Sequence, residues 1–376
     1  MSVTSITDKN KYLLWVKSGG RCQYRGCNCS LTQDILTKRN FNKAYIAHIV
    51  ADVPGGPRGD AVRSPLLKDD ITNLMLLCDA HHRLIDRADV AGHPEKLLLE
   101  MKKEHENRIE TVTAIDQDRQ SYILTYKANV GVFTPELSYQ TVSQYLQPDY
   151  FPAMADTIDL SLSNSIQKDS TPAYWTTEVA NLEAQFDRKL FQKFTKGEIQ
   201  HLSVFAFAPI PLLIKLGTLI NDIYKSNIHQ KVRNPDTWNL DDDTTEVKYT
   251  LIEPEKKHKT VALNISLSAT ITNDRITQVL GEECDIFTFT IDNPFNDYLK
   301  SKKHLGDFSI AFRQLFNQIK AKYGAQTPIH IFPAMPIAKA VELGRVWMPK
   351  ADMPLYLYDE NTANSGFVKV IEIINQ

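Results

Sequence analysis

Short apolar runs alternate with amphipathic segments over the C-terminal part of the chain. Six of these runs have the length and apolar content of strands: SVFAFA, VALNISLS, CDIFTFTI, PIHIF, PLYLY and FVKVIEI. Between them, residues 179–194 and 312–323 place apolar side chains at helical spacing, and the second segment stops just before Gly324. This alternation predicts an α/β body whose sheets are at least partly parallel.

Two segments of this body resemble each other. Residues 201–217 (HLSVFAFAPIPLLIKLG) and 328–344 (PIHIFPAMPIAKAVELG) each suggest a strand, a proline turn and a short helix that ends in Leu-Gly. The similarity predicts two related α/β halves, with coincidence as the alternative, because strand, proline turn and helix recur widely. Both helix N-termini would then face a similar edge, where backbone N–H groups can hold phosphate.

The N-terminal part has a different pattern. An apolar-spaced stretch around Tyr12 gives way to a segment rich in Cys, Gly and Asn, and residues 93–112 predict a long amphipathic helix with Pro94 in its first turn. Residues 119–150 mix polar residues with short apolar runs. The sequence therefore predicts three parts: a small domain over 1–118, a connector over 119–150 and a larger domain over 151–376.

Composition and charge narrow the class of protein. Hydrophobic residues make up 43% of the 376 residues and charged residues 23%, which argues against collagen, a coiled coil or wholesale disorder. Apolar runs of membrane-spanning length and a signal-peptide pattern are both missing, so we expect a cytoplasmic protein that does not enter a membrane. Lys and Arg exceed Asp and Glu by 17 to 14 in the first 110 residues, whereas acidic residues lead by 31 to 26 thereafter. A basic head of this size permits contact with nucleic acid without requiring it.

Four of the five cysteines fall in the first 80 residues, and their spacing favours a metal site over disulfides. Cys22-x4-Cys27 and Cys78-x2-His81 form two short pairs of ligands, as a tetrahedral structural zinc site requires. Cys29 could replace Cys27. A set of buried free cysteines is the alternative to a metal.

Three further residues surround this predicted zinc site. His82 directly follows His81, so it points away from the zinc; Asn73 lies nine residues earlier in NLMLLCDAHHRLID, and His48 lies in YIAHIVAD. Over about residues 15–110 the arrangement resembles the zinc-containing HNH endonucleases, with the first His ending a strand, the Asn on the returning strand and the last His starting a helix. The resemblance implies an α+β domain with the ββα-metal fold.

The resemblance also implies a role for each residue. His48 would be the general base that activates water, Asn73 would fix the His48 loop or ring, and His82 would hold a catalytic Mg²⁺. Ala47 stands where many members have an Asp or His ligand, which leaves the second protein ligand of that metal open. The segment offers nothing that reads bases, so little sequence specificity toward double-stranded DNA is expected. Four arginines could bind phosphates or be ordinary surface charges: Arg58, Arg63, Arg83 and Arg87.

The larger domain resembles SAVED, a fusion of two CARF-like halves that senses cyclic oligonucleotides. The resemblance rests on HLSVFAFAPIPLLIKLG, HQKVRNPDTW and IFPAMPIAKAVELGR and spans about residues 150–376. An HNH head on an α/β SAVED body is similar to the HNH-SAVED effector nucleases of CBASS, the cyclic-oligonucleotide-based antiphage system. It implies a cyclic di- or trinucleotide activator and assembly into a homo-oligomer, expected to be a tetramer.

A pocket for such a ligand needs cations, helix N-termini and flat side chains. Arg233 and Trp238 supply a cation and a flat side chain, and Gln230 could read a base edge; the proline turn at 332–335 could hold a base or ribose. Packing is the alternative for each. The candidate ligand contacts are Gln230, Arg233, Trp238, Phe332, Pro333 and Met335.

These observations predict a ligand-gated, metal-dependent DNA endonuclease. Two other functions fit some of them. A restriction-type HNH nuclease that reads modified DNA would act without a small ligand and would have a basic C-terminal surface, which the acidic balance disfavours. A zinc-stabilised nucleotide sensor without cleavage activity is favoured by Ala47 but disfavoured by the three residues His48, Asn73 and His82.

Overall fold

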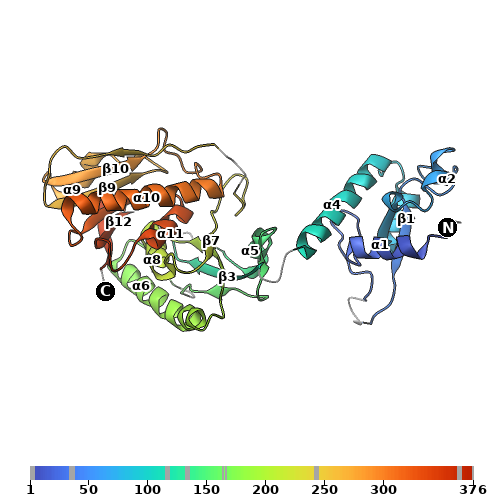
Figure 1. The fold of residues 1–376 in the computed structure, drawn as a ribbon, viewed down its shortest axis with the longest axis horizontal. Helices are drawn as coiled ribbons and strands as arrows, with labels where there is room; N and C mark the ends of the chain where they lie inside the picture. Colours follow the sequence, from blue (N-terminus) through green and yellow to red (C-terminus); the bar gives the residue numbers. More distant parts are fainter. Residues whose placement is uncertain are drawn as a thin grey trace. The chain divides into compact units, whose positions relative to one another are not determined.

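The chain forms two compact units, Met1–Asp116 and Gln117–Gln376, each with its own hydrophobic core. Figure 1 shows the computed structural model with its elements labelled. The predicted domain boundary at residue 118 lies outside the described residues. Among the described part of the chain, every helix is too short or too polar to cross a membrane. The structure describes residues 5–33, 39–114, 119–131, 136–162, 165, 167–240, 245–361 and 366–374.

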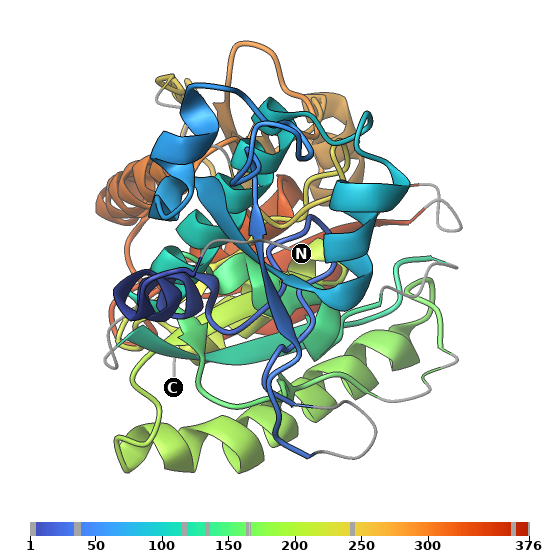
Figure 2. The ribbon, with the colours of Figure 1, turned by 90° about the vertical axis from the view of Figure 1, so that its right-hand side faces the viewer.

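The first unit is built around two antiparallel strands followed by a helix (Figure 2). The strand β2 is apolar on both faces, and its residues Leu74–Leu77 are fully buried together with Leu14 and Leu98 from two helices that pack beside it. This small core fixes the ends of both strands. Its elements are α1 (Asp8–Ser18), β1 (Ala44–His48), α2 (Arg63–Leu67), η1 (Ile71–Asn73), β2 (Leu74–Cys78), α3 (Asp79–Arg83), η2 (Leu84–Ala88) and α4 (Glu95–Thr113).

The second unit contains two sheets, one for each predicted half. The first sheet has the order β4-β3-β6-β7, with β5 also beside β3, and all of its pairs are parallel. Its strands are β3 (Gln120–Lys127), β4 (Phe151–Pro152), β5 (Ile158–Asp159), β6 (Leu202–Phe207) and β7 (Ser226–Ile228). The helices of this half are α5 (Tyr139–Val142), η4 (Ser143–Leu146), α6 (Pro172–Phe186), η5 (Asp187–Phe191), α7 (Gln192–Thr195) and α8 (Ile210–Ile220).

The second sheet has the order β13-β12-β11-β9-β10-β8. Its four inner strands are parallel, and the two edge strands are antiparallel to their neighbours. The strands are β8 (Thr250–Ile252), β9 (Thr260–Ser266), β10 (Cys284–Thr290), β11 (Ile329–Ala334), β12 (Leu355–Asn361) and β13 (Gly366–Ile373). The helices are α9 (Asn273–Leu280), α10 (Lys302–Tyr323) and α11 (Ile337–Val346), and the α/β architecture predicted for this body is present.

The expected connector over 119–150 is instead part of the second unit. Strand β3 lies within this segment and pairs in parallel with β6 from Tyr122 to Lys127. Five of its eight residues are buried, because a parallel strand has packing on both faces. Its short apolar run lacks the two-residue alternation of a half-exposed strand, so the sequence pattern did not distinguish it from a linker.

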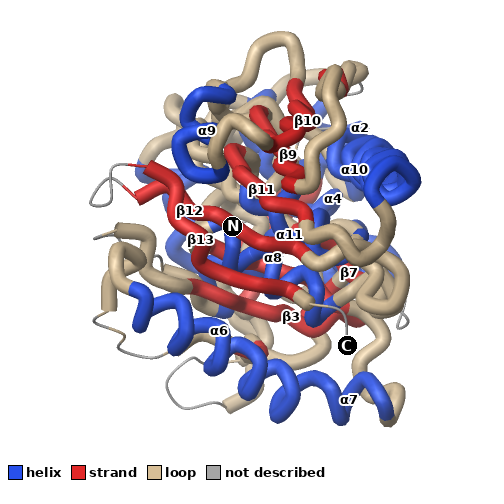
Figure 3. The backbone as a smooth tube through the Cα atoms, turned by 90° about the vertical axis from the view of Figure 1, so that its left-hand side faces the viewer, coloured by secondary structure: helices blue, strands red, loops and turns tan. Residues whose placement is uncertain are grey.

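The two similar sequence segments occupy matching places in the two halves. Each forms a strand followed by a helix, β6 with α8 and β11 with α11, and the two helices pack directly on each other (Figure 3). The prediction that each helix ends in Leu-Gly was wrong, because α8 continues to Ile220 and α11 to Val346. Gly217 and Gly344 lie at the helix crossing instead.

The crossing leaves no room for a side chain at either glycine. A Cβ atom on Gly217 would lie 2.0 Å from the carbonyl oxygen of Val341, and one on Gly344 would lie 2.0 Å from that of Ile214. Both neighbours are backbone atoms, which cannot rotate away. The missing side chains therefore set how closely the two halves approach.

We expect Gly217→Ala to destabilise the second unit by about 1–3 kcal/mol, because the helices must separate to admit the methyl group. Thermal and urea unfolding of the purified variant measure this. The control is Gly306→Ala in α10, where a Cβ atom would meet nothing within 4 Å. That change should leave stability equal or raise it by up to about 1 kcal/mol, since alanine favours helix. Equal unfolding midpoints for the two variants would contradict the role of the crossing.

Candidate functional site

Four cysteine side chains meet in one cluster in the first unit. The Sγ atoms of Cys22, Cys27, Cys29 and Cys78 all lie within 4.8 Å of one another. Cys78 ends β2, and the other three lie on a turn closed by a hydrogen bond of 3.0 Å from the Cys22 N–H to the Cys29 carbonyl. In a tetrahedral site with Zn–S bonds of about 2.3 Å, sulfur atoms lie about 3.8 Å apart. The donor type and the spacing of these thiols therefore suit a structural zinc ion.

The structure brings together more candidate ligands than zinc requires. The sequence prediction took Cys22, Cys27, Cys78 and His81, with Cys29 as a substitute for Cys27; both Cys27 and Cys29 lie in the cluster. The Nδ1 atom of His81 is 3.1 Å from the Cys78 Sγ and 3.8 Å from the Cys22 Sγ, and its ring stacks on Tyr24 at 4.0 Å. His81 thus lies beside a complete set of four thiols.

The thiols of the cluster differ in acidity. Burial raises the pKa of Cys22 and raises that of Cys29 to about 12. Burial also opposes ionisation of Cys27, but hydrogen bonds from the Cys29 backbone and from the neighbouring thiols outweigh it and lower the pKa of Cys27. Cys27 therefore becomes the thiolate, the form that binds metal, more readily than Cys22 or Cys29.

His48 ends β1 and is 7% exposed. Its Nε2 atom lies 2.8 Å from the carbonyl oxygen of Lys68. A carbonyl can only accept a hydrogen bond, so Nε2 carries the hydrogen and Nδ1 keeps a free lone pair. This contact prepares Nδ1 to accept a proton.

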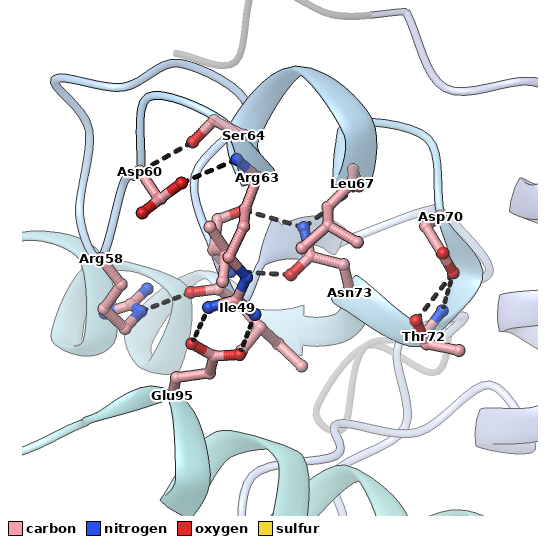
Figure 4. A network of polar contacts seen from close by, with 11 residues as sticks. Ile49, Arg58, Asp60, Arg63, Ser64, Leu67, Asp70, Thr72, Asn73 and Glu95 are labelled. Carbon is pink, nitrogen blue, oxygen red and sulfur yellow. Dashed lines mark hydrogen bonds and ion pairs between the residues drawn. The ribbon is translucent and has the colours of Figure 1, made fainter.

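Asn73 fixes the chain that follows His48 (Figure 4). Its Oδ1 accepts a hydrogen bond of 2.8 Å from the Val50 N–H, and its Nδ2 donates to the carbonyl oxygens of Val50 at 2.8 Å and Leu67 at 3.1 Å. The backbone of Asn73 also accepts from the Ile49 N–H at 2.8 Å. Because Asn73 is uncharged and contacts backbone alone here, it holds this loop without changing the charge around His48.

His82 and Asp86 lie one helical turn apart, after β2. The His82 Nε2 is 3.3 Å from a carboxylate oxygen of Asp86, and the His82 ring stacks on Tyr45 at 4.9 Å. The other carboxylate oxygen of Asp86 accepts a hydrogen bond of 2.7 Å from Arg58. Burial opposes ionisation of Asp86, but the hydrogen bonds from His82 and Arg58 outweigh it and lower the pKa of the carboxyl group.

A pocket of about 560 Å³ unites these groups. His48, His82 and Asp86 all line it, so two imidazole rings and a carboxylate group lie around one pocket. Ala47 is buried and paired with Met75, so the position before His48 offers only a methyl group. Asp86 was not singled out from the sequence, although its spacing of four residues from His82 in HHRLID places both on one helix face. Further lining residues are Tyr45, Asp52, Asp79, Arg83 and Arg87.

The arginines considered as phosphate ligands have different surroundings. The Arg58 side chain is 8% exposed and donates to the carbonyl oxygens of Ile49 at 2.6 Å and Ile85 at 2.7 Å, so it has a structural role. Arg63 pairs with Glu95 outside the pocket. Arg83 and Arg87 line the pocket, and the Arg83 Nε donates to Asp79 at 2.9 Å.

The residues predicted to contact a small ligand in the second unit do not form one site. Gln230 is buried, and its Oε1 accepts a hydrogen bond of 3.0 Å from the Ala338 N–H at the start of α11. Trp238 is 5% exposed and packs edge-to-face on Phe205, whereas Arg233 is exposed. Gln230 thus caps a helix, and most of Trp238 belongs to the core.

The expected proline turn at 332–335 is also corrected. Phe332 and Pro333 lie inside β11, and the Phe332 ring is fully buried against Tyr358. Met335 is 4% exposed in the main core. These side chains fill the space between sheet and helices, so Phe332 and Met335 have no surface for a ligand.

Comparison with known proteins finds a family model that matches part of the second unit. Residues 182–373 match the family model of SAVED, the "SMODS-associated and fused to various effectors sensor domain". No curated protein matched the chain.

Similar solved structures are SAVED/CARF-domain containing receptors called Cap4. One from Acinetobacter baumannii, solved with the cyclic trinucleotide 2'3'3'-cAAA, is 13% identical over 74% of this chain and 55% of its own, with a TM-score of 0.43. Another, from Moraxella osloensis, is 12% identical over 74% of this chain and 60% of its own, with a TM-score of 0.41.

The chain thus spans only 55 to 60% of the length of these receptors. The family match, by contrast, covers more than half of the chain and takes in the second α/β half and the part of the first half from the end of α6 onward. The chain therefore belongs to the SAVED family of sensor domains.

Proposed function

We propose that the chain is a metal-dependent DNA endonuclease of CBASS-type antiviral defence, switched on by a cyclic oligonucleotide. The observation that carries the nuclease proposal is the pocket in which His48 and His82 meet, with Asn73 fixing the loop between them. The order of β1, β2 and α3 beside a thiol cluster supports an HNH domain of the ββα-metal kind.

The residues of the pocket divide the work of phosphodiester hydrolysis. His48 takes a proton from the attacking water at Nδ1, since its Nε2–H is held by the Lys68 carbonyl. His82 and Asp86 would hold a Mg²⁺ ion, which stabilises charge on the phosphate and the leaving oxygen. Arg83 and Arg87 attract the DNA backbone without reading its sequence.

The thiol cluster supports a proposal for a structural zinc. Zinc held by Cys22, Cys27, Cys29 and Cys78 would tie the turn after α1 to the end of β2. His82 lies four residues beyond Cys78, so the same ion would fix the start of the helix that carries the catalytic groups. The small core of this unit gains most from such a cross-link.

Membership of the SAVED family supports the proposal for the activator. Cap4 receptors have been solved with the cyclic trinucleotides 2'3'3'-cAAA and 3'3'3'-cAAA, and we infer that this chain responds to a cyclic di- or trinucleotide. The acidic C-terminal part of the sequence is poorly suited to clamp DNA. Ligand binding would instead drive assembly into a homo-oligomer, a tetramer in our proposal, that brings nuclease domains together.

We expect His48→Ala to reduce plasmid cleavage by about 10²–10⁴-fold, measured with Mg²⁺ and an activating cyclic oligonucleotide. The matched control is Lys68→Ala, which removes an exposed side chain but keeps the carbonyl that contacts His48. This control should cleave at nearly the wild-type rate. Cleavage by His48→Ala at the wild-type rate would exclude His48 as the base, and a wild type inactive with every cyclic oligonucleotide would contradict the gated nuclease.

We expect Cys29→Ser to lose zinc and to melt at a lower temperature, because it removes one of four ligands. His81→Gln should keep about one zinc per chain, since the four thiols suffice. Elemental analysis and thermal unfolding of both variants decide the ligand set. Zinc kept by Cys29→Ser but lost by His81→Gln would restore the set with His81, and a wild type without zinc would remove the site.

Assembly gives an independent test of gating. Light scattering should show a larger mass when 3'3'3'-cAAA or another activating cyclic oligonucleotide is added, because a ligand shifts assembly only if it binds the assembled form more tightly. The same mass with and without an activating ligand would contradict the assembly step, even if cleavage still required the ligand.

A further inference from the structure

One face of the first sheet in the second unit carries polar side chains where an apolar surface is expected. Ser203 on β6 pairs in register with Asn227 on β7, and His229 follows on the same face. Their neighbours Val204 and Ile228 point to the other face and join the main core. One face of the sheet is therefore apolar, and part of the other face is polar.

The polar face is only partly covered. Phe205 and Ile123 of this face are buried with Trp238 under the segment that contains η4. The serines lie further along: the Ser203 hydroxyl is 2.8 Å from that of Ser121, which is 2.9 Å from the His201 Nδ1. Buried polar groups are costly unless they are hydrogen-bonded. Ser203 is fully buried and lies in the wall of a cleft.

The cleft has a volume of about 770 Å³. Ser203, Asn227 and His229 are on one side of it, and the segments 147–149 and 301–303 provide further walls. A second pocket of about 210 Å³ shares Asn227 and His229 with the cleft and reaches Arg345. A volume of this order suits a nucleotide, since small-molecule sites occupy roughly 300–1,000 Å³.

The wall at 301–303 is positively charged. It is the start of α10, a helix of 22 residues, whose N-terminus Ser301 caps through a hydrogen bond of 3.3 Å from the His304 N–H. Lys302 and Lys303 add two ammonium groups to the positive end of the helix dipole, and the Lys303 Nζ also pairs with Asp307 at 2.7 Å. Lys302 pairs with Asp149 of the neighbouring segment 147–149. Both side chains are exposed, so this ion pair contributes little and a phosphate could replace it.

His229 offers an unused hydrogen-bonding atom at the same cleft. Its ring stacks on Phe205 at 4.1 Å, and its buried Nε2 is without a hydrogen-bond partner among the described residues. Burial lowers the pKa of His229 to about 3, and a hydrogen bond to the Trp238 backbone partly opposes this, so the ring is neutral. The other ring nitrogen, Nδ1, donates the hydrogen bond to the Trp238 backbone, so Nε2 carries a lone pair. Nε2 can therefore accept a hydrogen bond from the exocyclic amino group of a base.

We propose that this cleft binds a nucleotide with an amino-bearing base, its phosphate at Lys302 and Lys303 and its base edge at Asn227 and His229. Where the ligand is a cyclic oligonucleotide, the assignment of this cleft rests on the proposed function. Arg233, Phe332 and Pro333 are not among the residues that line the cleft, whereas Trp238 lines the smaller pocket beside it.

The test is calorimetric titration of the full chain with 3'3'3'-cAAA and, separately, with ADP. Lys302→Gln should weaken binding by about tenfold, because a charge-assisted contact to phosphate is lost. Asp149→Asn should strengthen binding, because it removes the carboxylate that competes with phosphate. If Lys302 and Asp149 were needed only for folding, their substitutions would not change the binding affinity in opposite directions. His229→Phe keeps the stacked ring but loses the acceptor, and should also bind more weakly.

Lys320→Gln is the matched control, because it makes the same change near the other end of α10. Its affinity should equal that of the wild type. If ADP follows this pattern but no cyclic oligonucleotide binds, the cleft stands and the proposed activator fails. If 3'3'3'-cAAA binds the wild type and all variants equally, the cleft is overturned while cyclic-oligonucleotide sensing stands. Binding of neither probe to the wild type would also overturn the cleft.

Discussion

The close packing of α8 on α11 is the constraint on which the second unit depends. Two glycines meet there, and each has the backbone of the other helix where its own side chain would be. Each helix directly follows a central strand of its sheet, so the separation of the helices also sets the separation of the two halves. Residues of α10 and α11 can therefore border the same pocket as residues of β7, although they belong to different halves.

The first unit reaches a defined geometry in a different way. Its core is small, and the positions of its functional side chains depend on polar contacts with backbone. Asn73 holds the loop after β1, the Lys68 carbonyl accepts a hydrogen bond from His48, and Arg58 donates to two carbonyl groups. Each contact joins segments separated in sequence. Such contacts give little net stability individually, but they restrict the directions in which His48 and its neighbours can point.

Much of the fold and of the candidate site could be predicted from the sequence. The predictions that were wrong have physical reasons. Strong apolar runs gave the α/β body, and the spacing of Cys, His and Asn led to the thiol cluster and to the pocket with His48 and His82. Strand β3 was missed because a strand buried on both faces lacks alternation. The glycines of α8 and α11 were taken for helix ends, since a close approach of backbones and a helix terminus both call for glycine.

The residues of the proposed nucleotide cleft in the second unit were the least predictable. An aromatic or arginine side chain in a loop-like segment has the same sequence signature whether it contacts a ligand or the core. The cleft, by contrast, is formed by a serine and an asparagine inside strands, which are individually unremarkable in a sequence. Only the three-dimensional structure shows that they share an uncovered part of one sheet face.

Arg58 gives the pocket lined by His48 and His82 an unusual balance of charge. Its guanidinium group is fixed by two carbonyl oxygens and contacts the carboxylate of Asp86, so it remains in place whatever binds nearby. A divalent ion at Asp86 would share that carboxylate with a permanent positive charge and would bind weakly on its own. A DNA phosphate would reduce the excess of positive charge, so metal and substrate would bind cooperatively, each raising the affinity for the other. The coupling between metal and substrate would thus follow from one arginine that takes no part in the chemistry.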